Sequence, residues 1–330
     1  MVIFVNVVVI VADSLRVDHV GCYGSSVQTP NIDELAKEST VFENAFSEGL
    51  PTLPTRTTWW TGRYTFPFRG WQQFEHSDLL LAEVLWNKGC KSALISDTYH
   101  MHKPIYNCGR GFDNVVWVRG QEYDPWIVDP HVTIDLTKYH RLRGDETDEA
   151  WRVRFEQYLR NVSWIKNEED YFVARVVKEA VNWLENTVKN VRQKDKLFLW
   201  VDCFDPHEPF GEHGYIRKAK PFNYEYLVHI PWIIKHPDGI VKYKRVKKIV
   251  QTVDLMPTIL DFLGVSREKL ELPFLAPTGR MFPQDIKIAS KYAKLHGHSL
   301  MPLIEGKIEK IRDYAYIGHY GRQWSIRNEE

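Results

Sequence analysis

The chain has 330 residues, with 43 Lys and Arg residues balanced by 43 Asp and Glu residues. This length suits one large α/β domain or about two ordinary domains. A hydrophobic content of 44% allows a substantial core, which excludes disordered and fibrous proteins. Because the formal net charge is zero, no overall positive field is present to hold nucleic acid, and we expect no nucleic-acid partner.

The N-terminal segment is apolar and rich in β-branched residues up to Asp13. It has no positively charged start and no small-residue cleavage site, and about ten apolar residues are too few to span a bilayer. We therefore predict a buried parallel strand and no membrane partner. The four cysteines are too widely spaced for a zinc knuckle or a disulfide framework, which favours reduced thiols in a cytoplasmic protein.

Helix and strand signals alternate along the rest of the chain. Thr29 followed by Pro30 predicts a capped helix N-terminus, and Ser77 predicts another, ahead of an apolar helix that stops at Gly89. Further signals predict a strand at 91–96, two charged helices between 145 and 190 that separate near Asn167, strands at 196–204 and 229–236, and a short helix ending at Gly264. This alternation predicts an α/β fold with a doubly wound, mostly parallel sheet flanked by helices.

Polar residues that directly follow predicted strands are candidate site residues, because open parallel sheets bind ligands at the carboxyl ends of their strands. Five residues stand at such positions: Asp13, Thr98, His100, Asp205 and His207. Asp13 could simply cap a helix, since Asp is a good N-cap residue. Its carboxylate could instead bind a hard metal ion. The local sequence leaves both interpretations open.

The segment at 51–56, with the sequence PTLPTR, indicates a helix N-terminus. Thr52 could serve there only as a cap. Its hydroxyl could instead be a nucleophile, because the helix dipole and free N–H groups stabilise an attacked oxyanion such as phosphate. Arg56 falls on the same helical face, and its guanidinium can bind nonbridging oxygens in a bidentate manner. Taken alone, the motif is a weak signal of catalysis.

Several motifs occur in an order typical of one family. They are DSLRVDHVGCYG, TPNIDELA, TLPTRTTWWTGRY, SDTYH, DPHEPF, GEHGYIRK and TVDLMPTILDFLG. Together they resemble the sulfatase family of the alkaline phosphatase superfamily, and the resemblance spans nearly the whole chain. It implies a sulfatase-like α/β fold, a divalent metal ion (Mn²⁺, Zn²⁺, Ca²⁺ or Mg²⁺) and hydrolysis of a small anionic ester.

The resemblance also implies roles for individual residues. Asp13 matches the first metal-binding aspartate, although Ser14 stands where many sulfatases have a second one. Thr52 matches the nucleophile, which also contacts the metal, and Arg56 matches the arginine of the same motif. Thr98 takes the place of a lysine in the family's G-K-W-H turn. The resemblance further implies that Thr98 and His213 bind the substrate. It implies that His100, His207 and Lys218 are catalytic.

Thr52 departs from the family pattern, and this departure decides which chemistry we expect. Sulfatases oxidise a Cys or Ser at this position to formylglycine, whereas oxidation of threonine would give a ketone that hydrates poorly. A threonine alkoxide is the nucleophile of phosphodiesterases in this superfamily, where metal coordination activates the hydroxyl. We therefore expect hydrolysis of phosphate diesters or phosphonate esters through Thr52. The alternatives are an arylsulfatase-like sulfuric ester hydrolase and an inactive relative that binds an anion or a partner.

A second departure lies at Phe210 and Gly211, which are adjacent in this sequence. In relatives the stretch between them holds several helices, a strand and an S-D-H-G motif that completes the metal site. We expect a segment to be missing here, and a Cα–Cα separation far beyond about 3.8 Å would show it. We assign residues 1–264 to the catalytic domain and 265–330 to a surface excursion and the start of a C-terminal antiparallel subdomain, with a first hairpin from Tyr314 onward.

Overall fold

The structure, a computed structural model, describes residues 6–129, 134–138, 148–192, 195–206, 223–239, 244–266, 270 and 294–329. The chain forms two compact units. The first unit contains residues 1–14 and 89–219, and the second contains residues 15–88 and 220–330. The expected domain boundary at residue 264 stays a prediction.

The first unit is built on a four-stranded sheet in the order β1-β7-β5-β6, in which all neighbouring strands are parallel. The strands are β1 (Val7–Ala12), β5 (Lys91–Ser96), β6 (Asn114–Trp117) and β7 (Leu197–Cys203). All seven residues of β7 are buried. The predicted parallel sheet and its strands at 91–96 and 196–204 are confirmed, whereas β6 is too short to be recognised from its sequence.

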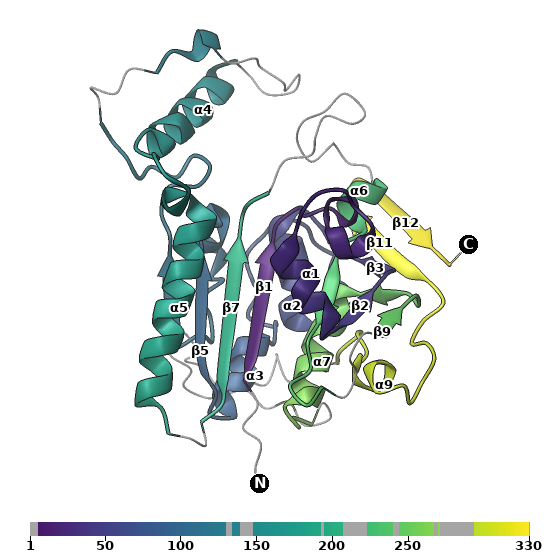
Figure 1. The fold of residues 1–330 in the computed structure, drawn as a ribbon. Helices are drawn as coiled ribbons and strands as arrows, with labels where there is room; N and C mark the ends of the chain where they lie inside the picture. Colours follow the sequence, from purple (N-terminus) through teal and green to yellow (C-terminus); the bar gives the residue numbers. More distant parts are fainter. Residues whose placement is uncertain are drawn as a thin grey trace. The chain divides into compact units, whose positions relative to one another are not determined.

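Two helices of the first unit lie between β6 and β7 in the sequence, α4 (Asp148–Val162) and α5 (Phe172–Asn190). Figure 1 shows α5 lying along the face of β5 and β7. Phe172, Val176 and Ala180 recur every four residues and pack into the core against these strands. The prediction of two helices that separate near residue 167 is confirmed.

The first strand, β1, is a parallel strand as predicted, but it is not buried. Within the described residues only β7 pairs with it, so β1 forms an edge of the sheet. The side chains of Val8 and Ile10 are 50% and 72% exposed. A continuous β-branched run is typical of strands with covered faces. The burial of a strand depends on the elements that pack on it as well as on its composition. The prediction that β1 is buried is wrong.

The second unit contains three small sheets and several short helices. The sheets have the orders β8-β2-β9, β10-β3 and β12-β11-β4. Their strands are β2 (Thr40–Phe42), β3 (Ala45–Phe46), β4 (Gly49–Leu50), β8 (Trp232–Ile234), β9 (Lys244–Val246), β10 (Val250–Gln251), β11 (Ala315–His319) and β12 (Gln323–Arg327). The helices are α1 (Pro30–Lys37), α2 (Thr52–Thr61), α3 (Leu81–Asn87), α6 (Glu225–Val228), α7 (Leu255–Phe262) and α9 (Met301–Ile304).

The predicted C-terminal hairpin is confirmed as the antiparallel pair β11 and β12. β11 also pairs in parallel with β4, where Gly318 lies opposite Gly49. Phe66 packs so closely on Gly318 that a Cβ there would lie 2.1 Å from a ring carbon. The hairpin therefore supports β4, which comes just before the candidate nucleophile Thr52.

One predicted helix cap is confirmed in position and another is wrong. Helix α1 begins at Pro30 with Thr29 at its N-cap position, as predicted, and the hydroxyl of Thr29 accepts the N–H of Gly21 at 2.8 Å. Helix α3 begins at Leu81, so Ser77 is not its cap. Its first turn is closed by the carboxylate of Glu83, which accepts the N–H of Leu80 at 3.1 Å. The predicted strand at 229–236 is present as β8, but it is antiparallel to β2.

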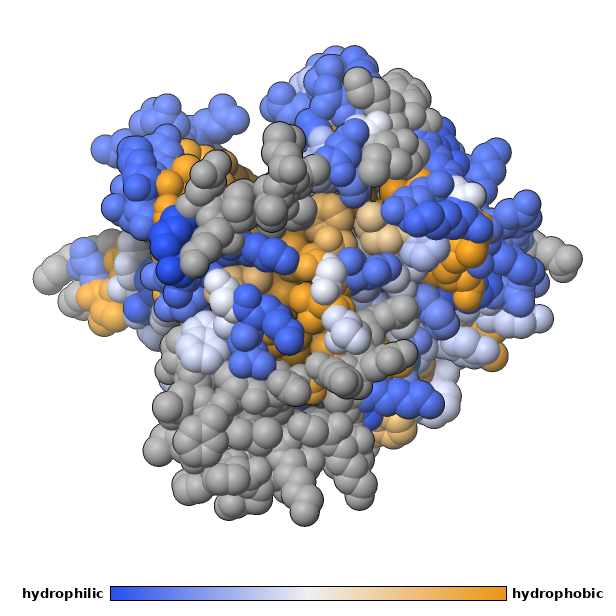
Figure 2. Space-filling model, turned by 90° about the horizontal axis from the view of Figure 1, so that it is seen from below, coloured by the Kyte–Doolittle hydropathy of each residue, from blue (hydrophilic) through white to orange (hydrophobic). Residues whose placement is uncertain are grey.

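The surface is mixed in character. On the face shown in Figure 2, hydrophilic side chains predominate among the described residues and hydrophobic ones show between them. No helix in the described ranges is long and apolar enough to cross a membrane. The predicted surface excursion at 265–295 falls almost entirely outside the described residues.

Candidate active site

Asp13 lies directly after β1 in the first unit. Its backbone N–H donates to the carbonyl of Cys203 at 2.9 Å, which continues the pairing of β1 with β7. The residue is 5% exposed. The hydroxyl of Ser14 donates to Oδ1 of Asp13 at 3.0 Å, and Ser14 adopts a positive φ of 62°. The serine that replaces a second aspartate therefore orients the first one.

Thr98 is fully buried after β5. Its hydroxyl donates to Oδ1 of Asp202 at 3.1 Å, while the indole N–H of Trp200 donates to Oδ2 of the same carboxylate at 3.0 Å. Asp202 lies on β7, so this contact joins the carboxyl ends of β5 and β7. It gives Thr98 a structural contact, and its role toward a substrate stays a prediction.

Asp97 was not among the residues singled out from the sequence. It is fully buried, and its Oδ1 accepts the N–H of Phe204 at 2.8 Å. Oδ2 is also buried and has no hydrogen-bond partner among the described residues. Burial, and then the nearby carboxylates of Asp205 and Asp202, raise the pKa of Asp97 to about 8. Its position directly after a buried strand was the signal that could have found it.

His100 lies on a short 3-10 helix, Tyr99–His102, that follows β5. Its Nε2 lies 3.0 Å from a carboxylate oxygen of Glu122. The imidazole also packs against the rings of Tyr99 and Tyr123, with centroid separations of 5.5 and 5.8 Å. These three contacts fix the orientation of the imidazole ring. A side chain that transfers protons to or from a substrate needs such a fixed orientation.

In the second unit, Thr52 is the first residue of α2, and Pro51 occupies the cap position before it. The interpretation of Thr52 as a mere cap is therefore wrong. The hydroxyl of Thr55 donates to the carbonyls of Gly49 and Pro51, which fixes the start of the helix. Thr52 is 4% exposed, so its backbone and side chain are tightly surrounded.

Arg56 follows Thr52 by one helical turn, as the sequence spacing predicts. Its side chain is almost fully buried, with a residue exposure of 2%, and its guanidinium lies 4.9 Å from the ring centroid of Trp59. This cation–π contact with the indole helps to hold the guanidinium in place. A buried, oriented guanidinium suits the bidentate binding of an anion.

A buried acidic network lies beside the segment that leads to Thr52. Glu48 is fully buried, and its Oε2 accepts the hydroxyl of Thr252 at 3.1 Å. Burial and the charge of Asp254 raise the pKa of Glu48 well above its usual range. Asp254 in turn forms an ion pair with Arg312. Like Asp97, Glu48 was missed because a single sequence does not reveal which acids are buried.

Other predicted features lie beyond what the structure describes. His207, His213, Lys218 and the junction of Phe210 with Gly211 fall outside the described residues, so their roles stay predictions. Within the described residues no group of three or more His, Cys, Asp or Glu side chains could hold a metal ion. The carboxylate of Asp13 suits a hard divalent cation. Shared metal binding by Asp13 and Thr52, which belong to different units, stays a prediction.

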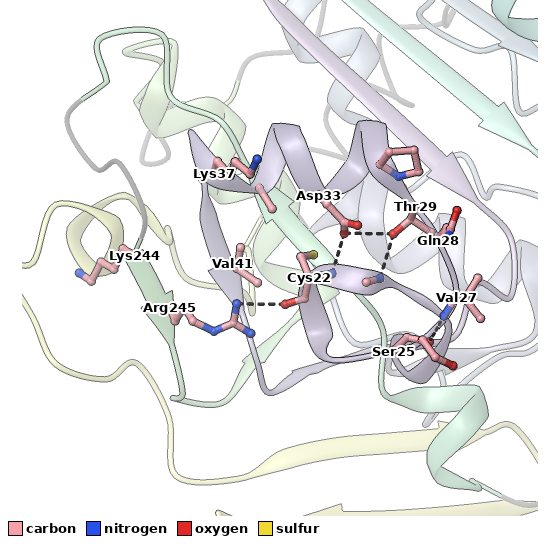
Figure 3. A pocket seen from close by; sticks show the side chains of 14 residues that line it. Cys22, Ser25, Val27, Gln28, Thr29, Asp33, Lys37, Val41, Lys244 and Arg245 are labelled. Carbon is pink, nitrogen blue, oxygen red and sulfur yellow. Dashed lines mark hydrogen bonds between the residues drawn. The ribbon is translucent and has the colours of Figure 1, made fainter.

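A cavity of about 530 Å³ in the second unit contains none of the predicted site residues. Figure 3 shows Asp33 accepting hydrogen bonds from the hydroxyl of Thr29 and the N–H of Cys22, and Arg245 donating to the carbonyl of Cys22. These polar groups satisfy one another. They fix the turn ahead of α1, and the candidate chemistry lies elsewhere in the chain.

Comparison with solved structures supports the fold. A phosphonate monoester hydrolase of Agrobacterium radiobacter superposes with a TM-score of 0.59 at 16% identity, covering 94% of this chain and 79% of that one. A protein solved in complex with its substrate D-glucosamine-2-N,6-O-disulfate gives a TM-score of 0.59 at 18% identity, covering 99% and 87%. At such identities the likeness is one of fold.

Comparison of sequences identifies the family. An ulvan-active sulfatase of Formosa agariphila is 25% identical over 348 residues, which covers 94% of this chain and 60% of the relative. The human iduronate 2-sulfatase is 46% identical over 59 residues, 18% of this chain and 10% of the relative. This chain thus spans about three fifths of the ulvan-active sulfatase. The sulfatase family model matches residues 5–222, and the chain belongs to the sulfatase family of the alkaline phosphatase superfamily.

Proposed function

We propose that this protein hydrolyses phosphate diesters or phosphonate esters, with the hydroxyl of Thr52 as nucleophile. The observation that carries the proposal is the placement of Thr52 as the first residue of α2, with Arg56 one turn further along the same helix. The positive end of the helix dipole favours an anion there, and the guanidinium supplies a second attraction. Threonine at this position cannot give the formylglycine that sulfatases use.

The chain's own residues would share the chemistry as follows. Arg56 binds the nonbridging oxygens and holds the phosphorus in line with the attacking hydroxyl. His100, oriented by Glu122, and His207 are the candidates to protonate the leaving oxygen. Asp13 would hold a divalent cation, which supplies charge neutralisation and lowers the pKa of a bound hydroxyl. Attack by Thr52 would give a phosphothreonine ester, which water then hydrolyses.

Two other functions have support of their own. Sulfate ester hydrolysis is favoured by the curated relatives, among them the ulvan-active sulfatase and an N-acetylglucosamine-6-O-sulfatase of Bacteroides thetaiotaomicron. An inactive, anion-binding relative is favoured by the sequence, because the S-D-H-G motif that completes the metal site in relatives is absent between Phe210 and Gly211. The phosphonate monoester hydrolases among the structural neighbours accord with the first proposal.

The deciding experiment compares aryl phosphate diester, aryl phosphonate and aryl sulfate substrates, with Mn²⁺, Zn²⁺, Ca²⁺ and Mg²⁺ added in turn. The expected result is turnover of the phosphorus esters and a phosphorylated Thr52 peptide, detected by mass spectrometry after rapid acid quenching. Thr52→Ala should abolish both signals and keep the fold, since Thr52 is not the cap of α2. Turnover by folded Thr52→Ala, or turnover of the sulfate ester alone, would overturn the proposal.

A further inference from the structure

Glu122 has an uncommon backbone conformation in the first unit. Its φ is 53°, in the left-handed region that few residues other than Gly and Asn adopt. The side chain is mostly buried, with 11% of it exposed. Backbone strain of this kind persists only where the surrounding structure imposes it, and it gathers at functional sites. The contacts of Glu122 therefore indicate what the strained conformation achieves.

The turn that carries Glu122 is held firmly in place. The carboxylate of Asp124 accepts the backbone N–H of Gly120 at 2.8 Å and forms an ion pair with Arg119 at 2.6 Å. The backbone N–H of Glu122 donates to the side-chain Oε1 of Gln121 at 3.2 Å. These contacts fix the backbone on both sides of Glu122, so its side chain is directed to one place.

The carboxylate of Glu122 faces the candidate catalytic residue His100. One of its oxygens lies 3.0 Å from Nε2 of the imidazole, and the rings of Tyr99 and Tyr123 contact the same imidazole. An ionised carboxylate accepts hydrogen bonds and cannot donate one, so the Nε2 that faces it carries a proton. Exchange of a proton with a substrate then falls to Nδ1 of His100.

Glu122 could instead serve only to balance the charge of Lys103. The ammonium of Lys103 lies 4.3 and 5.1 Å from the ring centroids of Tyr99 and Tyr123, which stabilise it. Partial burial lowers the pKa of Lys103 and the charge of Glu122 opposes this effect, so the two side chains do interact. Charge balance alone requires neither a positive φ nor a carboxylate 3.0 Å from an imidazole. The placement favours His100 as the group that Glu122 serves.

We propose that Glu122 is a positioning residue that holds the Nε2 proton of His100 and directs Nδ1 toward the substrate. As general acid, the imidazolium donates its Nδ1 proton to the leaving oxygen while the P–O bond breaks and its electron pair stays on that oxygen. The ring becomes neutral and keeps its proton on Nε2, and the charge of Glu122 balances the imidazolium before the transfer. The inference rests on the proposed ester hydrolase function and adds the ring nitrogen through which the proton passes.

Glu122→Gly separates the positioning role from a structural one. Glycine adopts a φ of 53° without strain, so the melting temperature should stay close to that of the wild type. For an alkyl phosphate diester, kcat should fall at least tenfold with little change in KM, and added formate should restore part of it. A nitrophenyl diester should lose much less, because its leaving group needs little protonation. Equal losses on both substrates would overturn the proposal.

Asn107→Gly is the matched control. Asn107 also lies in the first unit with a positive φ, 56°, but its side chain is exposed. Both variants place glycine at a left-handed residue, and only Glu122→Gly removes a carboxylate from His100. Asn107→Gly should therefore keep the wild-type kcat for both esters. A loss on the alkyl ester equal to that of Glu122→Gly would assign the effect to the backbone and contradict the inference.

Nitrogen–proton NMR tests the pair of Glu122 and His100 without turnover. A ring N–H that faces a carboxylate gives a proton resonance far downfield, and the correlated nitrogen shows whether Nε2 or Nδ1 carries the proton. The expected signal belongs to Nε2 and disappears in His100→Ala and in Glu122→Gly. Persistence in Glu122→Gly, or correlation with Nδ1, would overturn the inference. If no ester is turned over, the proposed hydrolase function fails, and this spectrum still decides whether Glu122 holds the Nε2 proton.

Discussion

Arg312 forms an ion pair with Asp254 inside the second unit. The carboxylate of Asp254 is fully buried, and the side chain of Arg312 is 9% exposed. The backbone N–H groups of His298 and Gln251 also donate to the carboxylate, at 2.8 and 3.0 Å. The segment ahead of β11 is thereby tied to the N-terminus of α7, so the C-terminal hairpin and the helical core depend on one pair of charges.

Removal of Arg312 should destabilise the protein strongly, because it leaves Asp254 buried without its cation. We expect Arg312→Ala to lower the free energy of unfolding by about 3–5 kcal/mol. Urea denaturation followed by circular dichroism measures the loss. Lys310→Ala is the control, since Lys310 pairs with Asp313 in solvent and should leave the midpoint unchanged. A similarly small effect of Arg312→Ala would show that the buried pair is not needed.

Asp97 predicts a pH dependence of stability. Its pKa is raised from an ordinary 3.8 to about 8, chiefly by burial. Between pH 3.8 and about pH 8, Asp97 is protonated in the folded protein and ionised in the unfolded chain. The free energy of unfolding that Asp97 contributes therefore falls as the pH rises, and it is lost above about pH 8. Asp97→Asn, which still accepts the N–H of Phe204, should remove this part of the slope. Denaturation at about pH 5 and about pH 9 measures it.

The control for Asp97→Asn is Glu179→Gln, which removes an exposed carboxylate on α5. Glu48 also has a raised pKa and contributes a slope of the same sign. The single Asp97 variant should therefore flatten the profile only in part, and addition of Glu48→Gln should flatten it further. An unchanged slope in Asp97→Asn would mean that the carboxyl is ionised, or relaxed into solvent, across the whole range.

The strands and helices of this fold were predictable where the apolar pattern is strong. The strands at 91–96 and 196–204 and the helix α5 carry such patterns, and the structure confirms them. Two pairings were not predictable, that of β10 with β3 and that of β11 with β4. Each involves only two residues on each strand, and the paired residues lie far apart in the sequence. Ser77 was a misleading cap signal, because the carboxylate of Glu83 closes the first turn of α3 instead.

The candidate site was predictable in residue type and less so in environment. Asp13, Thr98 and His100 were chosen as candidates because they follow predicted strands of a parallel sheet, and they do follow β1 and β5 in the structure. Asp97, adjacent to Thr98, escaped notice although it is fully buried. The sequence shows which types of side chain are present. Which of them are buried and which form hydrogen bonds depends on contacts made in the folded protein.

Arg56 should be sensitive to conservative replacement. Arg56→Lys keeps the positive charge but cannot bind two oxygens of an anion in parallel, as the planar guanidinium can. We expect kcat/KM for an aryl phosphate diester to fall by about 100-fold or more. The far-ultraviolet circular dichroism spectrum should match that of the wild type, which confirms that α2 remains folded. Retention of the wild-type rate would exclude bidentate binding by Arg56.

His207, which lies outside the described residues, is predicted from the sequence to protonate the leaving oxygen. A substrate with a good leaving group, such as a nitrophenolate, needs little protonation. His207→Ala should therefore reduce turnover of an alkyl ester by about 100-fold or more and that of a nitrophenyl ester much less. His100→Ala provides the comparison, because both histidines are candidates for this role. Equal losses on both substrates would assign His207 a different task.

Among the residues that the structure describes, β1 pairs only with β7, and this edge strand should make the protein prone to self-association. Val8 and Ile10 are exposed on a strand of six apolar residues that contains neither a charge nor a proline, and unprotected edges of this kind pair with other chains. Ile10→Lys should shift the protein toward the monomer in light scattering. Val188→Lys is the matched control, because Val188 is 60% exposed but lies on α5, where the backbone is already hydrogen-bonded. If both variants reduce association equally, exposed apolar surface in general is responsible. If only Ile10→Lys does so, the free edge of β1 is the contact.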